Sequence, residues 1–147
     1  CSDPELAKQL LYLRKLLKNK VPFMNCEKLI KKMGLEIIAS DSIDYSVEDM
    51  ILASTHKTKD EYTNRYKHLE KYSVLENTKD YSNGDIVIGS KPLGVKSELR
   101  HAFTVHSIQG ETAKHKLFID INKFRSLNML YTAMSRARTL DQIVFVK

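Results

Sequence analysis

The segment AFTVHSIQGETAKHKLFIDI, residues 102–121, places two short apolar runs, AFTV and LFIDI, on either side of a polar loop. Neither run alternates apolar and polar residues, which is the pattern of strands that are buried on both faces of a sheet. A helix is predicted from about Leu127 to Arg138 with Ser126 as its N-cap, and the run QIVFV follows as the last strand. Strands that alternate with helices predict an α/β layer fold with a mainly parallel sheet.

The same alternation continues toward the N-terminus. The runs LEIIA (35–39) and MILAS (50–54) predict two more strands. A helix is predicted after the second run, because Thr58 and Glu61 have the spacing of a capping box. The strand–loop–helix order of this region is therefore the same as in the C-terminal region.

Two helices are predicted ahead of these strands. The first begins with a capping box formed by Ser2 and Glu5, and its leucines follow at helical spacing. The second runs from Cys26 to Met33 with Asn25 as N-cap. The first helix is amphipathic, and Gly34 marks the end of the second.

A short β insert or hairpin is predicted between the middle and the C-terminal regions. The dipeptide Asn83-Gly84 is a turn signal, and the apolar run IVI follows it. The sequence contains neither an internal repeat nor a low-complexity segment. With 147 residues and 42% hydrophobic residues, the whole chain, 1–147, is expected to form one globular domain.

The net charge of +6 lies in the C-terminal part of the chain. Residues 1–85 contain 14 Lys/Arg and 14 Asp/Glu, whereas residues 86–147 contain 10 and 4. A basic surface on a neutral scaffold suggests a polyanionic partner such as a nucleic acid. Cys1 and Cys26 have no metal-site spacing and are interpreted as free thiols, and no metal site is predicted. The absence of a long apolar run and of a signal-peptide pattern predicts an intracellular protein without a membrane partner.

Arg136 and Arg138 lie two residues apart, in the stretch YTAMSRAR (131–138), just before the last predicted strand. In isolation, such arginines are most often solvated cations that the helix dipole favours at a helix C-terminus. Phosphate binding is the functional alternative, because a guanidinium stays charged and meets phosphate oxygens bidentately.

The stretches TVHSIQGET (104–112) and YTAMSRAR (131–138) resemble motifs V and VI of superfamily 1 helicases of the RecD-like branch, in the domain known as the UvrD-like helicase C-terminal domain. About 45 contiguous residues, 102–146, match in order and spacing. More weakly, MILASTHKTKDEYTNRYK resembles motif IV, and the first helix resembles the segment that follows motif III. The sequence contains no G-x-x-x-x-G-K-[ST] phosphate loop. The resemblance therefore implies the second RecA-like domain of a helicase, beginning just after motif III.

This resemblance implies roles for individual residues. Arg136 matches the arginine finger, which stabilises the charge of phosphoryl transfer across an interdomain cleft. Gln109, Gly110 and Glu111, with Arg138, match the side that faces the nucleotide, where Glu111 approaches the ribose. The expected contacts to single-stranded DNA phosphates come from two loops that follow predicted strands: Thr104, His106 and Ser107 in one loop, and Thr55 and His56 in the other.

Under this hypothesis the partners are single-stranded DNA and an upstream RecA-like domain of the same protein, with other replication proteins as further possible partners. The upstream domain would bind most of the ATP and Mg²⁺, so the chain by itself is expected to lack ATPase activity. A large DNA virus or a phage is a suggested source, which would place the protein in the cytoplasm or nucleus of a host cell. Two alternatives stay open: a non-catalytic nucleic-acid-binding module with a helicase-like fold, and a domain of an RNA helicase.

Overall fold

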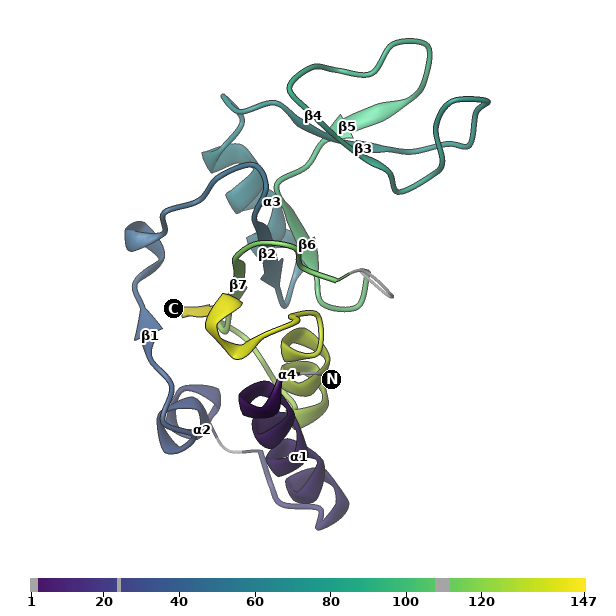
Figure 1. Ribbon diagram of the computed structural model, residues 1–147. Coiled ribbons are helices and arrows are strands. Elements are labelled where there is room, and N and C mark those ends of the chain that lie inside the picture. Colours follow the sequence, from purple (N-terminus) through teal and green to yellow (C-terminus); the bar gives the residue numbers. More distant parts are fainter. Residues whose placement is uncertain (1–2, 24, 108–111) are drawn as a thin grey trace.

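A five-stranded parallel sheet forms the centre of the molecule. The computed structural model describes residues 3–23, 25–107 and 112–147 (Figure 1). The strand order is β1-β8-β7-β2-β6, and every pair of neighbours is parallel. The strands are β1 (Ile37–Ile38), β2 (Met50–Ala53), β6 (Ala102–Thr104), β7 (Leu117–Asp120) and β8 (Ile143–Val146). The predicted α/β fold with a mainly parallel sheet is confirmed.

The strands at the centre of the sheet are buried on both faces. All residues of β6 and β7 are buried, as are the last three residues of β2. In the register, Ala53 lies opposite Thr104, and Leu52 lies opposite Ile119. Burial on both faces explains why these strands appear in the sequence as unbroken apolar runs.

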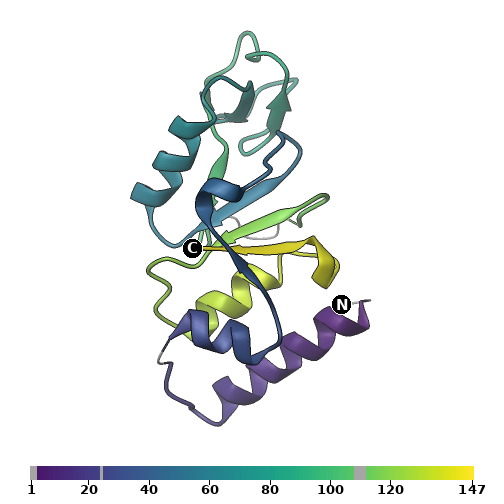
Figure 2. The same cartoon turned by 90° about the vertical axis from the view of Figure 1, so that its left-hand side faces the viewer.

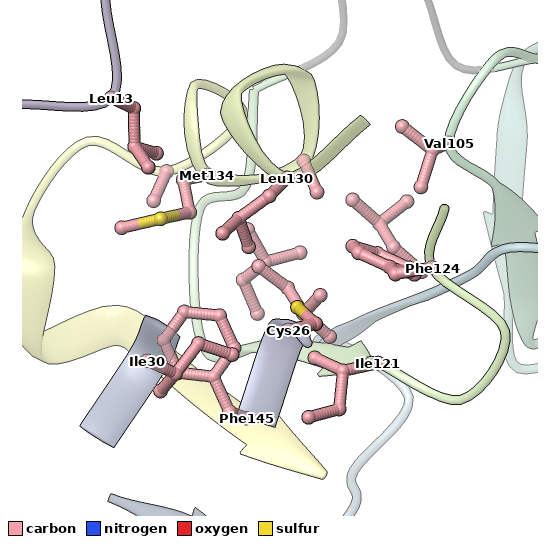
Figure 3. Close-up of a cluster of buried hydrophobic side chains, with 14 of the residues drawn as sticks. Leu13, Cys26, Ile30, Val105, Ile121, Phe124, Leu130, Met134 and Phe145 are labelled. Atoms are coloured by element: carbon pink, nitrogen blue, oxygen red, sulfur yellow. The ribbon is translucent and has the colours of Figure 1, made fainter. Parts of the chain in front are cut away.

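Three helices cover one face of the sheet. They are α1 (Pro4–Lys18), α2 (Cys26–Lys32) and α4 (Leu127–Met134), and Figure 2 shows them together on one side of the sheet. Figure 3 shows the core beneath them, where side chains of α1, α2 and α4 meet those of the sheet and of the segment after β7. Cys26 belongs to this core as a free thiol, and burial raises its pKa to about 12. The interpretation of this residue as a free thiol is confirmed, whereas Cys1 lies outside the described residues.

A single helix, α3 (His56–Arg65), covers the opposite face of the sheet. Tyr62 anchors it, with 3% of its surface exposed and its hydroxyl donating to Asp120 Oδ2 at 2.6 Å.

Within the described residues, no helix is both long and apolar enough to cross a membrane.

An antiparallel three-stranded sheet is inserted between α3 and β6. It consists of β3 (Lys71–Val74), β4 (Ile86–Ile88) and β5 (Ser97–Leu99) in the order β4-β3-β5, and it stands apart from the parallel sheet in Figure 1. The predicted β insert is confirmed, and of its three strands only β4 was predicted from the sequence. Two short 3₁₀ helices complete the fold, η1 (Ser40–Ser42) and η2 (Leu140–Gln142).

Two predicted helix starts are wrong by a few residues. The N-cap of α1 is Asp3 instead of Ser2, because the Asp3 carboxylate accepts a hydrogen bond from Leu6 N at 3.1 Å. The N-cap of α3 is Thr55 instead of Thr58, and its hydroxyl accepts from Thr58 N at 3.3 Å. The N-caps Asn25 of α2 and Ser126 of α4 are confirmed.

The predicted end of the last helix is also wrong. Helix α4 ends at Met134, with Ser135 as its C-cap, instead of continuing to Arg138. The Ser135 hydroxyl donates to the carbonyl of Thr132, and the next two amides bond only three residues back, so the helix tightens and stops. Arg136 and Arg138 therefore lie in the connection between α4 and β8.

Candidate functional site

The predicted nucleic-acid-binding residues lie on two neighbouring strand ends. Strands β2 and β6 are paired in parallel, and Val105 N donates to Ala53 O at 3.0 Å just past the last paired residues. Thr55 and His56 follow β2, and His106 follows β6, so both segments leave the same carboxyl edge of the sheet. Open α/β sheets place their ligands at this edge.

These residues differ in how accessible their side chains are. Thr104 is buried with 5% of its surface exposed, and its carbonyl accepts from both the amide and the hydroxyl of Ser107. The hydroxyl of Thr55 caps α3. His56, His106 and Ser107 are exposed. Among the predicted residues at this edge, the accessible polar side chains are therefore the two histidines and Ser107.

Arg136 is the predicted site residue with an unsatisfied buried donor. Its Nε atom is buried and has no hydrogen-bond partner among the residues that the structure describes. Its backbone is held on both sides: its amide donates to Ala133 O at 3.2 Å, and its carbonyl accepts from Ala113 N at 2.7 Å. Buried polar groups are nearly always paired in native proteins, so this nitrogen is a donor that the described residues leave unsatisfied.

Arg138 lies nearby on a more open surface. Its side chain is exposed, and its amide donates to Gln142 Oε1 at 2.6 Å. The segment that carries both arginines adjoins residues 113–116, which lead into the amino end of β7. The structure therefore places the arginines beside the amino ends of β7 and β8, away from the carboxyl edge that carries the histidines. Gln109, Gly110 and Glu111 lie outside the described residues.

The tyrosine of the YTAMSRAR stretch has a structural partner. Arg14 of α1 donates from Nε to the Tyr131 hydroxyl at 2.7 Å, and its guanidinium carbon lies 5.4 Å from the centre of the Tyr131 ring. Met134, in the same stretch, is fully buried in the core. Tyr131 and Met134 therefore pack α4 against α1 and the core.

A cleft of about 620 Å³ separates the β insert from the parallel sheet. Arg100 lies on its wall with its guanidinium carbon 4.6 Å above the centre of the Phe103 ring, and its Nε is a second buried donor without a partner among the described residues. Arg100 is not among the site residues predicted from the sequence. The only signal for it in the sequence is the basic excess of the C-terminal part.

A buried polar cluster joins the β insert to the parallel sheet. The His101 side chain is fully buried, and Nε2 donates to the carbonyl of Leu69 at 3.0 Å, since a carbonyl can only accept. Its Nδ1 therefore accepts from the Tyr45 hydroxyl at 2.8 Å. Lys71 donates from Nζ to the carbonyl of Asp49 at 2.7 Å. Burial lowers the pKa of His101 and lowers that of Lys71 to about 8.

Metal binding has no visible basis in the described part of the chain. No group of three or more His, Cys, Asp or Glu side chains there could hold a metal ion. The predicted site residues that the structure describes are therefore histidines and hydroxyls at the carboxyl edge of the parallel sheet, and arginines beside the amino ends of β7 and β8.

Comparisons with known proteins give a fold. No protein-family model and no curated protein matches the sequence. Among solved structures, the chain is similar to Pif1 helicase from Bacteroides in complex with ADP-AlF3 and single-stranded DNA, with a TM-score of 0.62 and 18% identity over 98% of this chain and 49% of that one. Pif1 helicase from Candida albicans gives a TM-score of 0.62 and 11% identity over 95% and 53%. A structure of two coordinating Pif1 helicases at forked double-stranded DNA gives 0.59 and 20% over 98% and 47%.

These likenesses define the class of fold. The parallel sheet flanked by helices has the RecA-like fold that is found in the Pif1 helicases. The chain spans about half the length of those helicases.

Proposed function

We propose that residues 1–147 form the C-terminal RecA-like motor domain of an ATP-dependent DNA helicase of the RecD-like branch of superfamily 1. Arg136 acts as its arginine finger, and the carboxyl edge of β2 and β6 forms part of the single-stranded DNA groove. The observation that carries the proposal is the buried Nε of Arg136, which has no partner among the described residues and lies on a backbone held by Ala113 and Ala133. The shared fold with Pif1 helicases supports the proposal.

In this proposal the nucleotide lies mainly on an upstream domain of the same protein. That domain binds ATP and Mg²⁺, and the metal neutralises phosphate charge there when bound. Arg136 fits the other side of such a site because its fork can donate to phosphate oxygens that carry the developing charge. The arginine reaches its acceptor only when the two domains close, so hydrolysis depends on domain position.

In this proposal the DNA contacts come from the carboxyl edge of β2 and β6, at the other end of the sheet from Arg136. His56 and His106 present exposed imidazoles at the ends of two adjacent strands, which suits phosphates of a DNA strand that crosses the sheet edge. Ser107 is exposed beside His106, and its hydroxyl would have to leave the carbonyl of Thr104 to donate to a phosphate. Thr104 and Thr55 support these contacts from beneath, because their groups are buried or engaged in capping. Arg138, Gln109, Gly110 and Glu111 are assigned to the nucleotide side.

The test is hydrolysis of ATP by the full-length protein, with and without single-stranded DNA. We expect Arg136→Ala to lower DNA-stimulated kcat by about 10³-fold or more with nucleotide affinity largely retained. Arg125→Ala is the matched control, because Arg125 is an exposed arginine outside the proposed site. Unchanged hydrolysis in Arg136→Ala would refute the finger, and DNA binding without any hydrolysis in the wild type would identify a binding module instead.

A further inference from the structure

Strand β4 forms a free edge of the β insert. It pairs with β3 on one side, and no strand among the described residues pairs with it on the other. Val74 N donates to the carbonyl of Asp85 at 2.9 Å, so this carbonyl faces β3. Because backbone groups alternate in direction along an antiparallel strand, the N–H and C=O groups of Ile86 and Ile88 point to the free edge.

The side chains of the same two residues line the cleft between the β insert and the parallel sheet. Ile86 and Ile88 are 39% and 48% exposed. In the register Ile88 lies opposite Lys71 and Ile86 lies opposite Ser73, so these four side chains share the face of the insert that borders the cleft. Exposed aliphatic side chains beside unpaired backbone groups are a template for an additional strand.

The charges in the cleft are unevenly paired. Arg100 and Lys114 line it without an ion-pair partner among the described residues, and the Nε of Arg100 is buried there without an acceptor. The carboxylates of the cleft already have partners: Asp49 accepts from the amides of Ser46 and Lys116, Asp85 accepts from the amide of Ser82, and Glu48 lies 3.6 Å from Nε2 of His115. A ligand that carries a carboxylate would therefore complement the unpaired cations.

We propose that the cleft binds an extended, carboxylate-bearing peptide of a partner protein, which adds a strand to the free edge of β4. The peptide backbone pairs with Ile86 and Ile88, its alternate aliphatic side chains pack against these isoleucines, and its carboxylate meets Arg100. Strand addition of this kind draws affinity from main-chain hydrogen bonds and specificity from the contacts of alternate side chains. The inference concerns the β insert and does not depend on the role of Arg136.

A single strand of nucleic acid fits this cleft less well. Proteins that bind single strands without sequence preference stack the bases on aromatic side chains. Phe103, which lines the cleft, is 7% exposed, and the guanidinium carbon of Arg100 covers it at 4.6 Å from the ring centre. Two isoleucines and an open strand edge match the apolar side chains and the backbone of a peptide instead.

The experiment measures the binding of a fluorescein-labelled peptide to the full-length protein by fluorescence anisotropy. In the probe peptide valine alternates with threonine, and one valine is replaced by glutamate. We expect Ile88→Glu to weaken binding at least about tenfold, because it removes an apolar contact and repels the peptide carboxylate. Leu11→Glu is the matched control, since Leu11 is a leucine of α1 that is 52% exposed, and it should bind like wild type. Equal affinities of the two variants, or no binding by wild type, would overturn the proposal.

A charge reversal tests the contact with Arg100. We expect Arg100→Glu to weaken binding of the glutamate peptide about tenfold or more and to regain affinity for a peptide with lysine in place of that glutamate. Circular dichroism of the variant checks that it is folded. An equal loss for both peptides in the folded variant, or no loss for either, would remove Arg100 from the site.

Amide hydrogen exchange detects the added strand directly. The probe peptide should slow exchange at the amides of Ile86 and Ile88, and a peptide that is N-methylated on the edge facing β4 should not. Unchanged exchange at both amides would overturn strand addition. Two other occupants would also overturn the proposal: single-stranded DNA, if it displaces the peptide and depends equally on Ile88 and Arg100, and a second copy of the chain, if the wild type dimerises without peptide and Ile88→Glu does not.

Discussion

Two regions of the molecule bury polar, nitrogen-bearing side chains in opposite ways. At the junction of the β insert and the parallel sheet, His101 and Lys71 are buried, with 0% and 5% of their surface exposed. Both ring nitrogens of His101 and the ammonium nitrogen of Lys71 have hydrogen-bond partners. At the segment after α4, the buried Nε of Arg136 has no partner among the described residues. The nitrogens of His101 and Lys71 are paired within the fold, whereas the described residues leave the Nε of Arg136 unsatisfied. In the function proposed above, an acceptor on the upstream domain meets this arginine.

The largest effect is expected from changing the shape of the unpaired cation while keeping its charge. Arg136→Lys preserves a positive charge and removes the planar fork, so we expect DNA-stimulated kcat to fall by about 10²-fold while the free energy of unfolding stays within about 0.5 kcal/mol of wild type. Steady-state hydrolysis and urea denaturation of the same preparation measure the two quantities. A lysine variant with wild-type kcat would show that charge alone suffices and that the fork has no role.

The paired cluster should respond in the reverse way. His101→Leu leaves the carbonyl of Leu69 and the hydroxyl of Tyr45 without their partner, so we expect the free energy of unfolding to fall by about 1–3 kcal/mol. Chemical denaturation followed by circular dichroism measures this loss. At a temperature where the variant is folded, DNA-stimulated kcat should remain near that of wild type. A specific loss of kcat without loss of stability would place His101 in the machinery and erase the contrast.

A smaller effect is expected at the DNA edge. His106 is exposed, and one hydrogen bond from it to a phosphate contributes about 1 kcal/mol, so His106→Ala should weaken single-stranded DNA binding about fivefold. Fluorescence anisotropy with a labelled oligonucleotide at fixed salt measures the change. His68→Ala, at an exposed histidine after α3, is the control. Equal affinities for wild type and His106→Ala would remove this residue from the groove.

A further effect, confined to alkaline pH, is a pH dependence of stability at Lys71. Burial lowers its pKa from 10.5 to about 8, so between these values the unfolded chain binds more protons than the folded one. Stability contributed through this group therefore rises as the pH rises from about 8 to about 10.5, and below pH 8 the full cost of burying the cation is present. The difference in free energy of unfolding between wild type and Lys71→Met should move in favour of wild type across that window. A difference that does not change with pH would show that Lys71 titrates normally.

The parallel sheet could be predicted from the sequence, because its strands are unbroken apolar runs. Strands β3 and β5 could not, since KYSV and SEL are short and mostly polar and are stabilised by pairing within the insert. The start of α3 was misplaced because Thr55 and Thr58 are both good N-caps, and only the hydrogen bond between them decides which one is used.

The site shows the same division between local and long-range information. The positions of Thr104, His106 and Arg136 on either side of β7 follow from the order of the motifs. The hydrogen bonds from the Gln142 side chain to the carbonyls of Ala113 and His115 could not be predicted. These partners lie about 30 residues away in the sequence and meet Gln142 because β7 pairs with β8. The end of α4 at Met134 was not predicted for a local reason: the Ser135 hydroxyl donates to the carbonyl of Thr132, and a serine at this position does not by itself indicate the end of a helix.

The most direct measurement compares the binding of ADP and of ADP with aluminium fluoride to the full-length protein on single-stranded DNA. The fluoride complex mimics the transferring phosphoryl group, so a finger should stabilise it far more than ADP. For Arg136→Ala we expect the affinity for the fluoride complex to fall by at least about 100-fold and the affinity for ADP to stay within about twofold of wild type. Equal changes for the two ligands, or no change for either, would contradict the assignment of Arg136 as the finger of a helicase motor.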